Sequence, residues 1–336
     1  MPSSFFPGAS VDDVMRSALE EIRARGQLIF PSKAGPNGAL EITGVLLALA
    51  APRARISRTE TRGRIFSALG ELCWYLAGSN DAKFISYYIR AYAESAEDGA
   101  IFGGYGVRLM NWKGLNQLAN VTALLSRKKD SRQAVIQLFD ALDIAVPRKD
   151  VPCTCTLQFM LRGGRFHLVT SMRSNDVHWG LPHDIFCFTM LQEIICRCVS
   201  ARLGESTELG EYKHAVGSLH LYSQHQGAAK RFLKEGWQPT TPSMPDMPRG
   251  DPWPSINVLL EAEAAIREGR SVNESKVREL DPYWADLVRL LQIFRAKHDR
   301  DAGRISNLRS RMACSGYDPF ISRALRQVLV LNPLDS

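Results

Sequence analysis

Hydrophobic and polar positions along this chain repeat with two different periods, and the longer period predicts helices. Residues 10–26 predict an amphipathic helix, because apolar side chains recur at helical spacing at Val11, Val14, Met15, Leu19 and Ile22. Residues 62–78 predict a second helix, which carries Glu71 and Trp74 and ends at Gly78. Residues 185–199 are apolar nearly all round, a pattern typical of a helix buried on every side.

The shorter period predicts strands. Residues 40–49 predict a strand that is entered from a Pro-Asn-Gly turn. Residues 133–140 and 155–171 also alternate, and Gly163-Gly164 divides the second segment into a hairpin. Helices and strands therefore interleave without a regular repeat, which favours a mixed α/β class over a doubly wound sheet.

The last third of the chain begins with a Pro-rich segment, residues 238–254, which predicts a loop. A further helix is indicated beyond it by Trp284, Leu287, Leu291 and Phe294. The basic residues that follow are interpreted as a solvated face: Arg295, Lys297, Arg300, Arg304, Arg309 and Arg311.

The length and composition of the chain are typical of a globular protein. A chain of 336 residues forms one large domain or two small ones, and 45% hydrophobic with 23% charged residues is ordinary for such proteins. The sequence contains no run of about 18 apolar residues, so no membrane span is expected. The N-terminal segment has the pattern of neither a signal sequence nor a transit peptide, so a cytoplasmic location is expected.

Charge and cysteine usage narrow the possible partners. Seven cysteines scattered along the chain do not form a disulfide framework, and the pairs Cys153/Cys155 and Cys196/Cys198 are spaced too tightly for a usual zinc site. No metal is expected. The net charge of +7 fits a small anionic substrate, and no aromatic-basic pattern typical of single-strand binding is evident. Nucleic acid is therefore not the expected partner.

Candidate chemistry gathers in the middle of the chain. Cys153 lies in Val-Pro-Cys-Thr, and residues 173–184 read Arg-Ser-Asn-Asp-Val-His-Trp-Gly-Leu-Pro-His-Asp. This order supplies a thiol nucleophile, a guanidinium that can bind phosphate and a carboxylate, Asp184, after a Gly-Leu-Pro turn. A lone cysteine in a strand usually only fills space in the core. The assignment of Cys153 as a nucleophile therefore depends on the surrounding pattern.

That pattern resembles the active-site core of the thymidylate synthase family. Four more segments match the family in order: Gly70–Gly78 with the catalytic Glu71, Gly103–Gly106 with Tyr105, Asp130–Arg132, and Gly217–His225. The resemblance implies an α/β layered fold with a bulged mixed sheet flanked by helices. It also implies a sheet-to-sheet homodimer. Residues 1–336 would form one catalytic domain, with a divergent C-terminal elaboration from about residue 230.

The resemblance implies a role for each matching residue in the reaction. Cys153 would add to C6 of a pyrimidine nucleoside monophosphate, and C5 would then attack the one-carbon unit of the co-substrate 5,10-methylenetetrahydrofolate. Glu71 would assist proton transfers, and Tyr105 and Asp184 complete the catalytic set.

The remaining matches would bind the two substrates. Arg173 and Ser174, with Arg132 from a second subunit, would hold the phosphate, and Lys33 is the nearest cationic candidate in the N-terminal phosphate loop. His220 and Tyr222 would bind the sugar. The folate would contact three further positions, Asp176, Trp74 and Gly180.

Asp184 departs from the family in a way that changes the expected base. A uracil-specific synthase has Asn here, whose amide matches O4 and N3–H of uracil. A carboxylate accepts from N4–H of cytosine, and it can face a second N–H once N3 takes a proton. The same substitution marks the cytidylate 5-hydroxymethylases of the family, in which water captures the exocyclic methylene and tetrahydrofolate is released. Further departures are Thr154, Met172, Gln133 and Ser218.

Two alternatives stay open at this stage. One is a thymidylate synthase that methylates dUMP, which Asp184 disfavours. The other is a non-catalytic relative that binds nucleotide or RNA, which the presence of Cys153 and Glu71 disfavours. The sequence does not decide between CMP and dCMP, or between nucleoside-antibiotic biosynthesis and modified DNA as the pathway.

Overall fold

The strands form one seven-stranded mixed sheet. The computed structural model describes residues 4–31, 35–241 and 243–331. In sheet order the strands run β1-β3-β7-β6-β5-β4, and β2 adds to β3. Their bounds are β1 Phe5–Gly8, β2 Gln27–Ile29, β3 Ala39–Leu49, β4 Val135–Gln137, β5 Thr154–Arg162, β6 Arg165–Asp176 and β7 Glu208–Tyr222.

Strand β7 is central to this sheet because it pairs with β3 on one side and β6 on the other. It runs antiparallel to β3 and parallel to β6, while β5 and β6 form the hairpin that Gly163-Gly164 predicts. Register shifts interrupt the β5–β6 pairing between Thr154 and Thr156, and the β6–β7 pairing between Phe166 and Leu168. This pairing brings the start of β5 next to the C-terminal ends of β6 and β7, and the candidate residues on these strands lie there.

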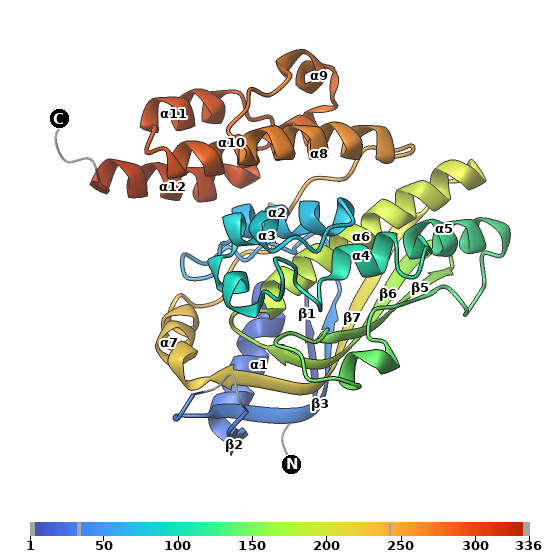
Figure 1. Ribbon diagram of the computed structural model, residues 1–336, viewed down its shortest axis with the longest axis vertical. Coiled ribbons are helices and arrows are strands. Elements are labelled where there is room, and N and C mark those ends of the chain that lie inside the picture. The colour runs from blue at the N-terminus through green and yellow to red at the C-terminus, as the bar shows by residue number, and fades with distance from the viewer. Residues whose placement is uncertain (1–3, 32–34, 242, 332–336) are drawn as a thin grey trace.

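Helices flank this sheet and stack in two layers above it (Figure 1). Helix α6 lies against β6 and β7 and is buried along most of its length, as its all-round apolar pattern predicts. It ends at Gly204, whose φ of 65° is a left-handed conformation that suits glycine. The helices nearest the sheet are α1 Val11–Arg25, α2 Ile65–Leu76, α3 Ala82–Tyr88, α4 Tyr105–Met110, α5 Gln117–Arg127, α6 Leu181–Leu203 and α7 Gln226–Lys234.

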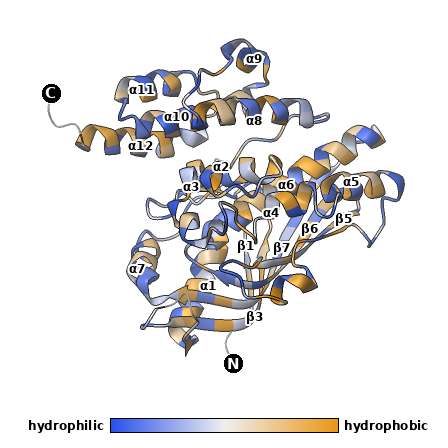
Figure 2. Cartoon of the chain, viewed as in Figure 1, coloured by the Kyte–Doolittle hydropathy of each residue, from blue (hydrophilic) through white to orange (hydrophobic). Residues whose placement is uncertain are grey.

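The C-terminal helices form an outer layer over α2 and α3 (Figure 1). They are α8 Trp253–Arg267, α9 Glu274–Glu279, α10 Pro282–His298, α11 Ala302–Ser310 and α12 Asp318–Leu331. Tyr88 donates a 2.9 Å hydrogen bond to Glu263, and Arg323 donates to the carbonyl of Thr59 at 3.1 Å. Orange and blue residues alternate around these helices in Figure 2, which is the pattern of amphipathic helices that bury one face.

Most of the elements expected from the sequence are confirmed. The helix expected over residues 10–26 is α1, and its N-cap Ser10 forms a reciprocal capping box with Asp13. The strand at 40–49 is β3, and the helices at 62–78 and 185–199 are α2 and α6. The mixed sheet flanked by helices is as expected. None of the helices in the described ranges is long and apolar enough to cross a membrane.

Candidate functional site

Cys153 and Arg173 lie side by side at the start of the β5–β6 hairpin pairing. The Arg173 amide donates to the Cys153 carbonyl at 2.8 Å, and the guanidinium Nη2 lies 3.6 Å from the Cys153 sulfur. The same guanidinium is held by the carbonyls of Val151 and Pro152, at 2.8 and 2.9 Å. A fixed cation next to a half-buried thiol favours the thiolate form, so Cys153 is placed as a nucleophile requires.

Tyr105 lies between Cys153 and Asp184. The amide and hydroxyl of Thr154, the residue after Cys153, both donate to the Tyr105 hydroxyl, at 3.1 and 2.9 Å. Burial raises the pKa of Tyr105 well above its usual range, and the neighbouring charges of Asp184 and Cys153 raise it further. The sulfur and the Asp184 carboxyl therefore approach the same phenol from different elements, one from the β5 start and one from α6.

Glu71 is buried on α2, with its carboxyl held by two phenols. Tyr75 and Tyr92 both donate to Oε1 of Glu71, at 3.0 and 2.8 Å. Burial raises the pKa of Glu71, and these two hydrogen bonds oppose the rise. A carboxyl whose pKa is raised by burial can serve as a general acid or base. Neither tyrosine was a candidate from the sequence, because Tyr75 lies in an apolar helix and looks like core, and Tyr92 lies in a short 3₁₀ helix without a motif.

Replacing Glu71 with glutamine is expected to stabilise the fold at high pH. Because the pKa of Glu71 is higher in the fold than the ordinary 4.5, its contribution to stability is fully present below pH 4.5 and is lost as the pH rises through the folded-state value. The E71Q variant cannot ionise and avoids this loss, so its Tm should exceed that of the wild type by a few degrees at alkaline pH. Melting curves over a pH series measure this. Identical pH dependence in both proteins would contradict it.

Asp184 lies in the first turn of α6, close to Glu71. Burial raises the pKa of Asp184 well above its usual range, the Glu71 carboxyl raises it further, and a hydrogen bond from Asn175 opposes both effects. Two carboxyls in one buried region cannot both ionise easily. The surroundings of Asp184 therefore favour its protonated form.

The segment expected to hold the sugar and folate folds around Asp176. The Asp176 carboxylate accepts from the amides of His178 and Trp179 and, at 3.4 Å, from the amide of Tyr222. Tyr222 packs against His220 with ring centroids 4.7 Å apart. Neither ring nitrogen of the buried His220 has a well-formed hydrogen-bond partner among the described residues, so the imidazole can still bind a hydroxyl.

The other candidates occupy different environments. Ser174 is half-buried on β6, and Arg132 is exposed beyond α5. Gly180 caps α6, where a Cβ would lie 2.8 Å from the Asn175 oxygen, so only glycine fits without a shift. Trp74 is 1% exposed and packs against Tyr75 and Tyr92, so its indole contacts protein rather than an open surface. Lys33 lies outside the described residues.

An open cleft of about 690 Å³ borders the Asp176 segment. Three arginines line it with aromatic and imidazole side chains, and the lining includes Arg62, Arg64, Arg231, His178, Trp179 and His225. Arg62 is buried, donates to the Trp179 carbonyl at 3.0 Å and lies over the Trp179 ring. The cleft is large enough for a drug-sized ligand and is positively charged.

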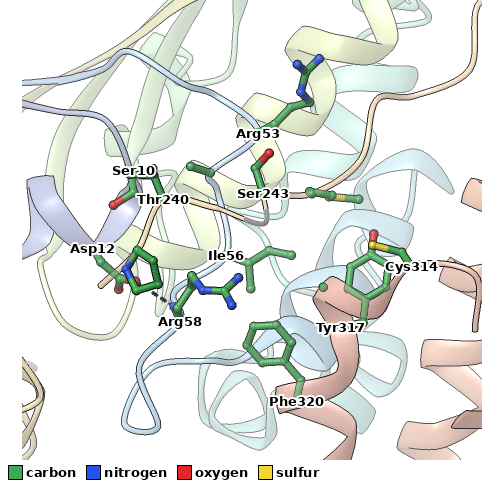
Figure 3. Close-up of a pocket in the computed structure, with 14 residues that line it drawn as sticks. Ser10, Asp12, Arg53, Ile56, Arg58, Thr240, Ser243, Cys314, Tyr317 and Phe320 are labelled. Carbon is green, nitrogen blue, oxygen red and sulfur yellow. Dashed lines mark hydrogen bonds between the residues drawn. The ribbon is translucent and has the colours of Figure 1, made fainter. Parts of the chain in front are cut away.

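A second cavity lies far from this chemistry in the sequence, beneath the C-terminal layer (Figure 3). Its volume of about 20 Å³ holds little more than one water molecule. Asp12 there accepts from Ser57 and from the Arg58 amide, and burial raises its pKa to about 6. The cavity is too small for a nucleotide. Within the ranges that the structure describes, no group of three or more His, Cys, Asp or Glu residues could hold a metal ion.

Comparison with known proteins matches the chain to a family, and two phage enzymes are among the similar proteins. Residues 57–247, more than half of the chain, match the family model described as thymidylate synthase. A deoxyuridylate hydroxymethyltransferase of Bacillus phage SP01 is 29% identical over an alignment of 238 residues that covers 66% of this chain and 60% of that protein. A deoxyuridylate hydroxymethyltransferase of Pseudomonas phage M6 is 29% identical over an alignment of 163 residues that covers 47% of this chain and 45% of that protein. The matches thus span about half of the length of these relatives.

Proposed function

Because this chain belongs to the thymidylate synthase family, we propose that it transfers a one-carbon unit from 5,10-methylenetetrahydrofolate to C5 of a cytidylate, forming 5-hydroxymethyl-CMP or 5-hydroxymethyl-dCMP. The observation that carries the proposal is the approach of Cys153, Glu71 and Asp184 to one cluster of buried tyrosines. The names of the phage relatives support hydroxymethylation, and Asp184 supports cytosine.

Cys153 begins the proposed reaction. Its thiolate forms a bond to C6 of the pyrimidine, and the ring electrons move toward N3 and C5, so that C5 becomes the nucleophile. Arg173 stabilises the thiolate before the addition, and as an exposed guanidinium it also offers donors to the substrate phosphate. The bond to Cys153 breaks again when the product forms.

Asp184 supplies the proton that this addition requires on cytosine. A neutral carboxyl donates its proton to N3 and accepts from N4–H with the other oxygen. When Cys153 adds to C6, the proton passes to N3, and the resulting carboxylate faces two N–H groups. Uracil already carries a proton on N3 and offers only the weakly basic O4. Passing the proton therefore stabilises the cytosine adduct more than the uracil adduct.

Glu71 serves the later proton transfers in this proposal. A carboxyl held by Tyr75 and Tyr92 through Oε1 leaves Oε2 for the substrate and for water. Its carboxylate removes the proton from C5 and passes it to the nitrogen of the leaving tetrahydrofolate, and the regenerated carboxylate then takes a proton from the water that adds to the exocyclic methylene. A raised pKa suits both steps, because the group exchanges protons readily in either direction.

The sugar and phosphate sites complete the nucleotide pocket. We place the sugar hydroxyl against His220 and Tyr222, and the phosphate against Arg173 and Ser174. Arg132 is exposed and would reach the phosphate of a partner subunit in a sheet-to-sheet homodimer. Each of the two equivalent sites would then contain residues from both subunits.

The cationic cleft would hold the glutamate tail of the folate, since its arginines match carboxylates and it borders the Asp176 segment. Removing both exposed arginines, in an R64A/R231A variant, is expected to raise the KM for methylenetetrahydrofolate by about thirtyfold, because the two lost charge-assisted hydrogen bonds together contribute about 2 kcal/mol. The kcat should change little. Steady-state kinetics with the folate varied measures this effect, and an R278A variant on α9 is the control. An unchanged KM would rule out this location of the tail.

The function itself is tested by incubating the full chain with CMP, dCMP and dUMP in the presence of methylenetetrahydrofolate. Mass spectrometry should detect a hydroxymethyl adduct of CMP or dCMP, without the dihydrofolate absorbance that accompanies methylation by hydride transfer. Methylated dUMP with dihydrofolate would instead identify a thymidylate synthase. Turnover of no pyrimidine nucleotide would favour a binding protein.

Deoxyuridylate hydroxymethylation is the second candidate, and the names of the two phage relatives favour it. A protonated Asp184 can donate to O4 and accept from N3–H, so uracil can enter the same pocket. Hydroxymethyl-dUMP as the main product in the assay above would establish this alternative.

A further inference from the structure

A chain of buried polar side chains extends from Asp184 into the protein interior. Asn175 hydrogen-bonds the Asp184 carboxyl, and its Nδ2 lies 2.9 Å from Nε2 of His214. The other ring nitrogen of His214, Nδ1, lies 2.5 Å from the Tyr212 hydroxyl. Asn175 and Asp184 both flank Gly180, where a Cβ would lie 2.8 Å from the Asn175 oxygen and 3.6 Å from the Asp184 Oδ2.

These side chains come from two parallel strands and lie away from solvent. Asn175 is on β6 and is 4% exposed, while His214 and Tyr212 are on β7 and are 0% and 1% exposed. Three polar groups in the layer between sheet and α6 are costly unless each finds a partner. Each of these groups hydrogen-bonds the next, and the row that they form ends at Asp184. A structural role alone would be met by apolar side chains of similar size.

The chain has a direction because His214 is neutral. Burial lowers the pKa of His214 to about 3, so its ring has one N–H donor and one acceptor at neutral pH. In one arrangement, which requires the Asn175 amide to rotate so that its oxygen rather than Nδ2 faces His214, Tyr212 donates to His214, His214 donates to the Asn175 oxygen, and the Asn175 amide donates to Asp184. In the other arrangement every donor is reversed, and Asp184 donates to Asn175. Both arrangements satisfy all partners, and they suit opposite charge states of Asp184.

We propose that Asn175, His214 and Tyr212 are positioning residues that adjust to the charge of Asp184 and thereby determine its selectivity for cytosine. The inference rests on the proposed function of Asp184 as the group that reads the base. When Asp184 passes its proton to N3, the carboxylate that remains needs a donor from behind. The relay, by which we mean Asn175, His214 and Tyr212, supplies this donor as the Asn175 N–H. Apolar side chains in the same place would supply no donor.

Other groups also face Asp184 and contribute to its proton affinity. Glu71 and Tyr75 approach from α2, Tyr105 from α4, and Cys187 from the next turn of α6. Glu71 raises the pKa of Asp184. Removing the relay should therefore leave Asp184 beside groups that disfavour its charge, without the one neighbour that favours it.

The experiment measures the titration of Asp184 directly. Carboxyl ¹³C NMR of aspartate-labelled protein gives its midpoint, with a D184N variant for assignment. N175L and H214F should each raise the apparent pKa of Asp184, and H214Q, which keeps a donor and an acceptor, should restore much of the wild-type value. H167F, which replaces a half-buried imidazole on β6 outside the relay, is the matched control. An unchanged midpoint in both N175L and H214F would overturn the relay.

A kinetic measurement then tests selectivity. In N175L the ratio of kcat/KM for the preferred cytidylate to that for dUMP should fall by about tenfold, the equivalent of one lost hydrogen bond to a charged group. The pH at which this kcat/KM changes should move with the Asp184 titration. Y212F removes only the terminal hydroxyl, so the selectivity ratio and the Asp184 titration should change in the same directions but by less. This variant provides the test if N175L does not fold.

The two measurements separate the inference from the function on which it rests. If the wild type converts no pyrimidine nucleotide, the proposed function fails, while the NMR titration still decides whether the relay controls Asp184. If the wild type is active and the variants shift neither the titration nor the ratio, the relay fails and the function stands.

Discussion

The C153S variant is expected to lose at least about a thousandfold in kcat for cytidylate hydroxymethylation, because an alcohol is almost entirely protonated near neutral pH and cannot add to C6. The neighbouring guanidinium of Arg173, 3.6 Å from the sulfur, stabilises a thiolate but cannot generate an alkoxide. Product formation measured by mass spectrometry gives the rate. Nucleotide binding, measured by calorimetry, should change little, since the hydroxyl is smaller than the thiol.

Cys155 provides the matched control for this prediction. It lies two residues further along the same strand, is also half-buried, and has its pKa raised by burial. The C155S variant should retain the rate of the wild type within a few-fold. If C153S kept its activity, or if C155S abolished it, Cys153 would not be the nucleophile.

The D184N variant is expected to reverse the preference for the base. An amide at this position cannot pass a proton to N3 of cytosine, although it can pair with N3–H and O4 of uracil. The ratio of kcat/KM for cytidylate to that for dUMP should therefore fall by on the order of 10³-fold, within the range that a site built around a specific hydrogen bond can achieve. Parallel assays with CMP, dCMP and dUMP measure it.

The size of this change also distinguishes the two candidate substrates. If the wild type prefers cytidylate and D184N still does, Asp184 does not read the base. If the wild type already prefers dUMP, the substitution should alter the preference little, and the reading of Asp184 as selective for cytosine would be abandoned. Thermal melting of D184N shows whether a lost activity reflects unfolding.

The sequence predicted those elements whose periodicity reflects simple burial. Helix α1 and strand β3 have one apolar face each, and α6 is apolar on all sides, so hydropathy alone located them. Strand β7 was not recognised. It carries the buried His214 and His220 among its apolar positions, which obscures the alternation that a strand normally shows.

Candidate site residues could be named from the sequence only where a motif existed, and their roles stay predictions. Cys153, Glu71 and Asp184 come from motifs, but Tyr92 contacts Glu71 from a 3₁₀ helix with no such signal. Asn175 and His214 are 39 residues apart in the sequence, so their contact depends on the pairing of β6 with β7. Trp74 was named as a folate contact from the same motif as Glu71, and although it is only 1% exposed, that role stays a prediction.

The outer layer of C-terminal helices has a consequence for the helix that carries Glu71. Helix α2 packs against α6 on one side and against α8 and α10 on the other, so its backbone lies between two layers of protein. Its amide hydrogens should then exchange with deuterium only when the outer layer detaches or the whole chain opens. Slow exchange in α2, comparable with that of the central strands, would mean that Glu71 is held in the most durable part of the molecule rather than on a mobile lid.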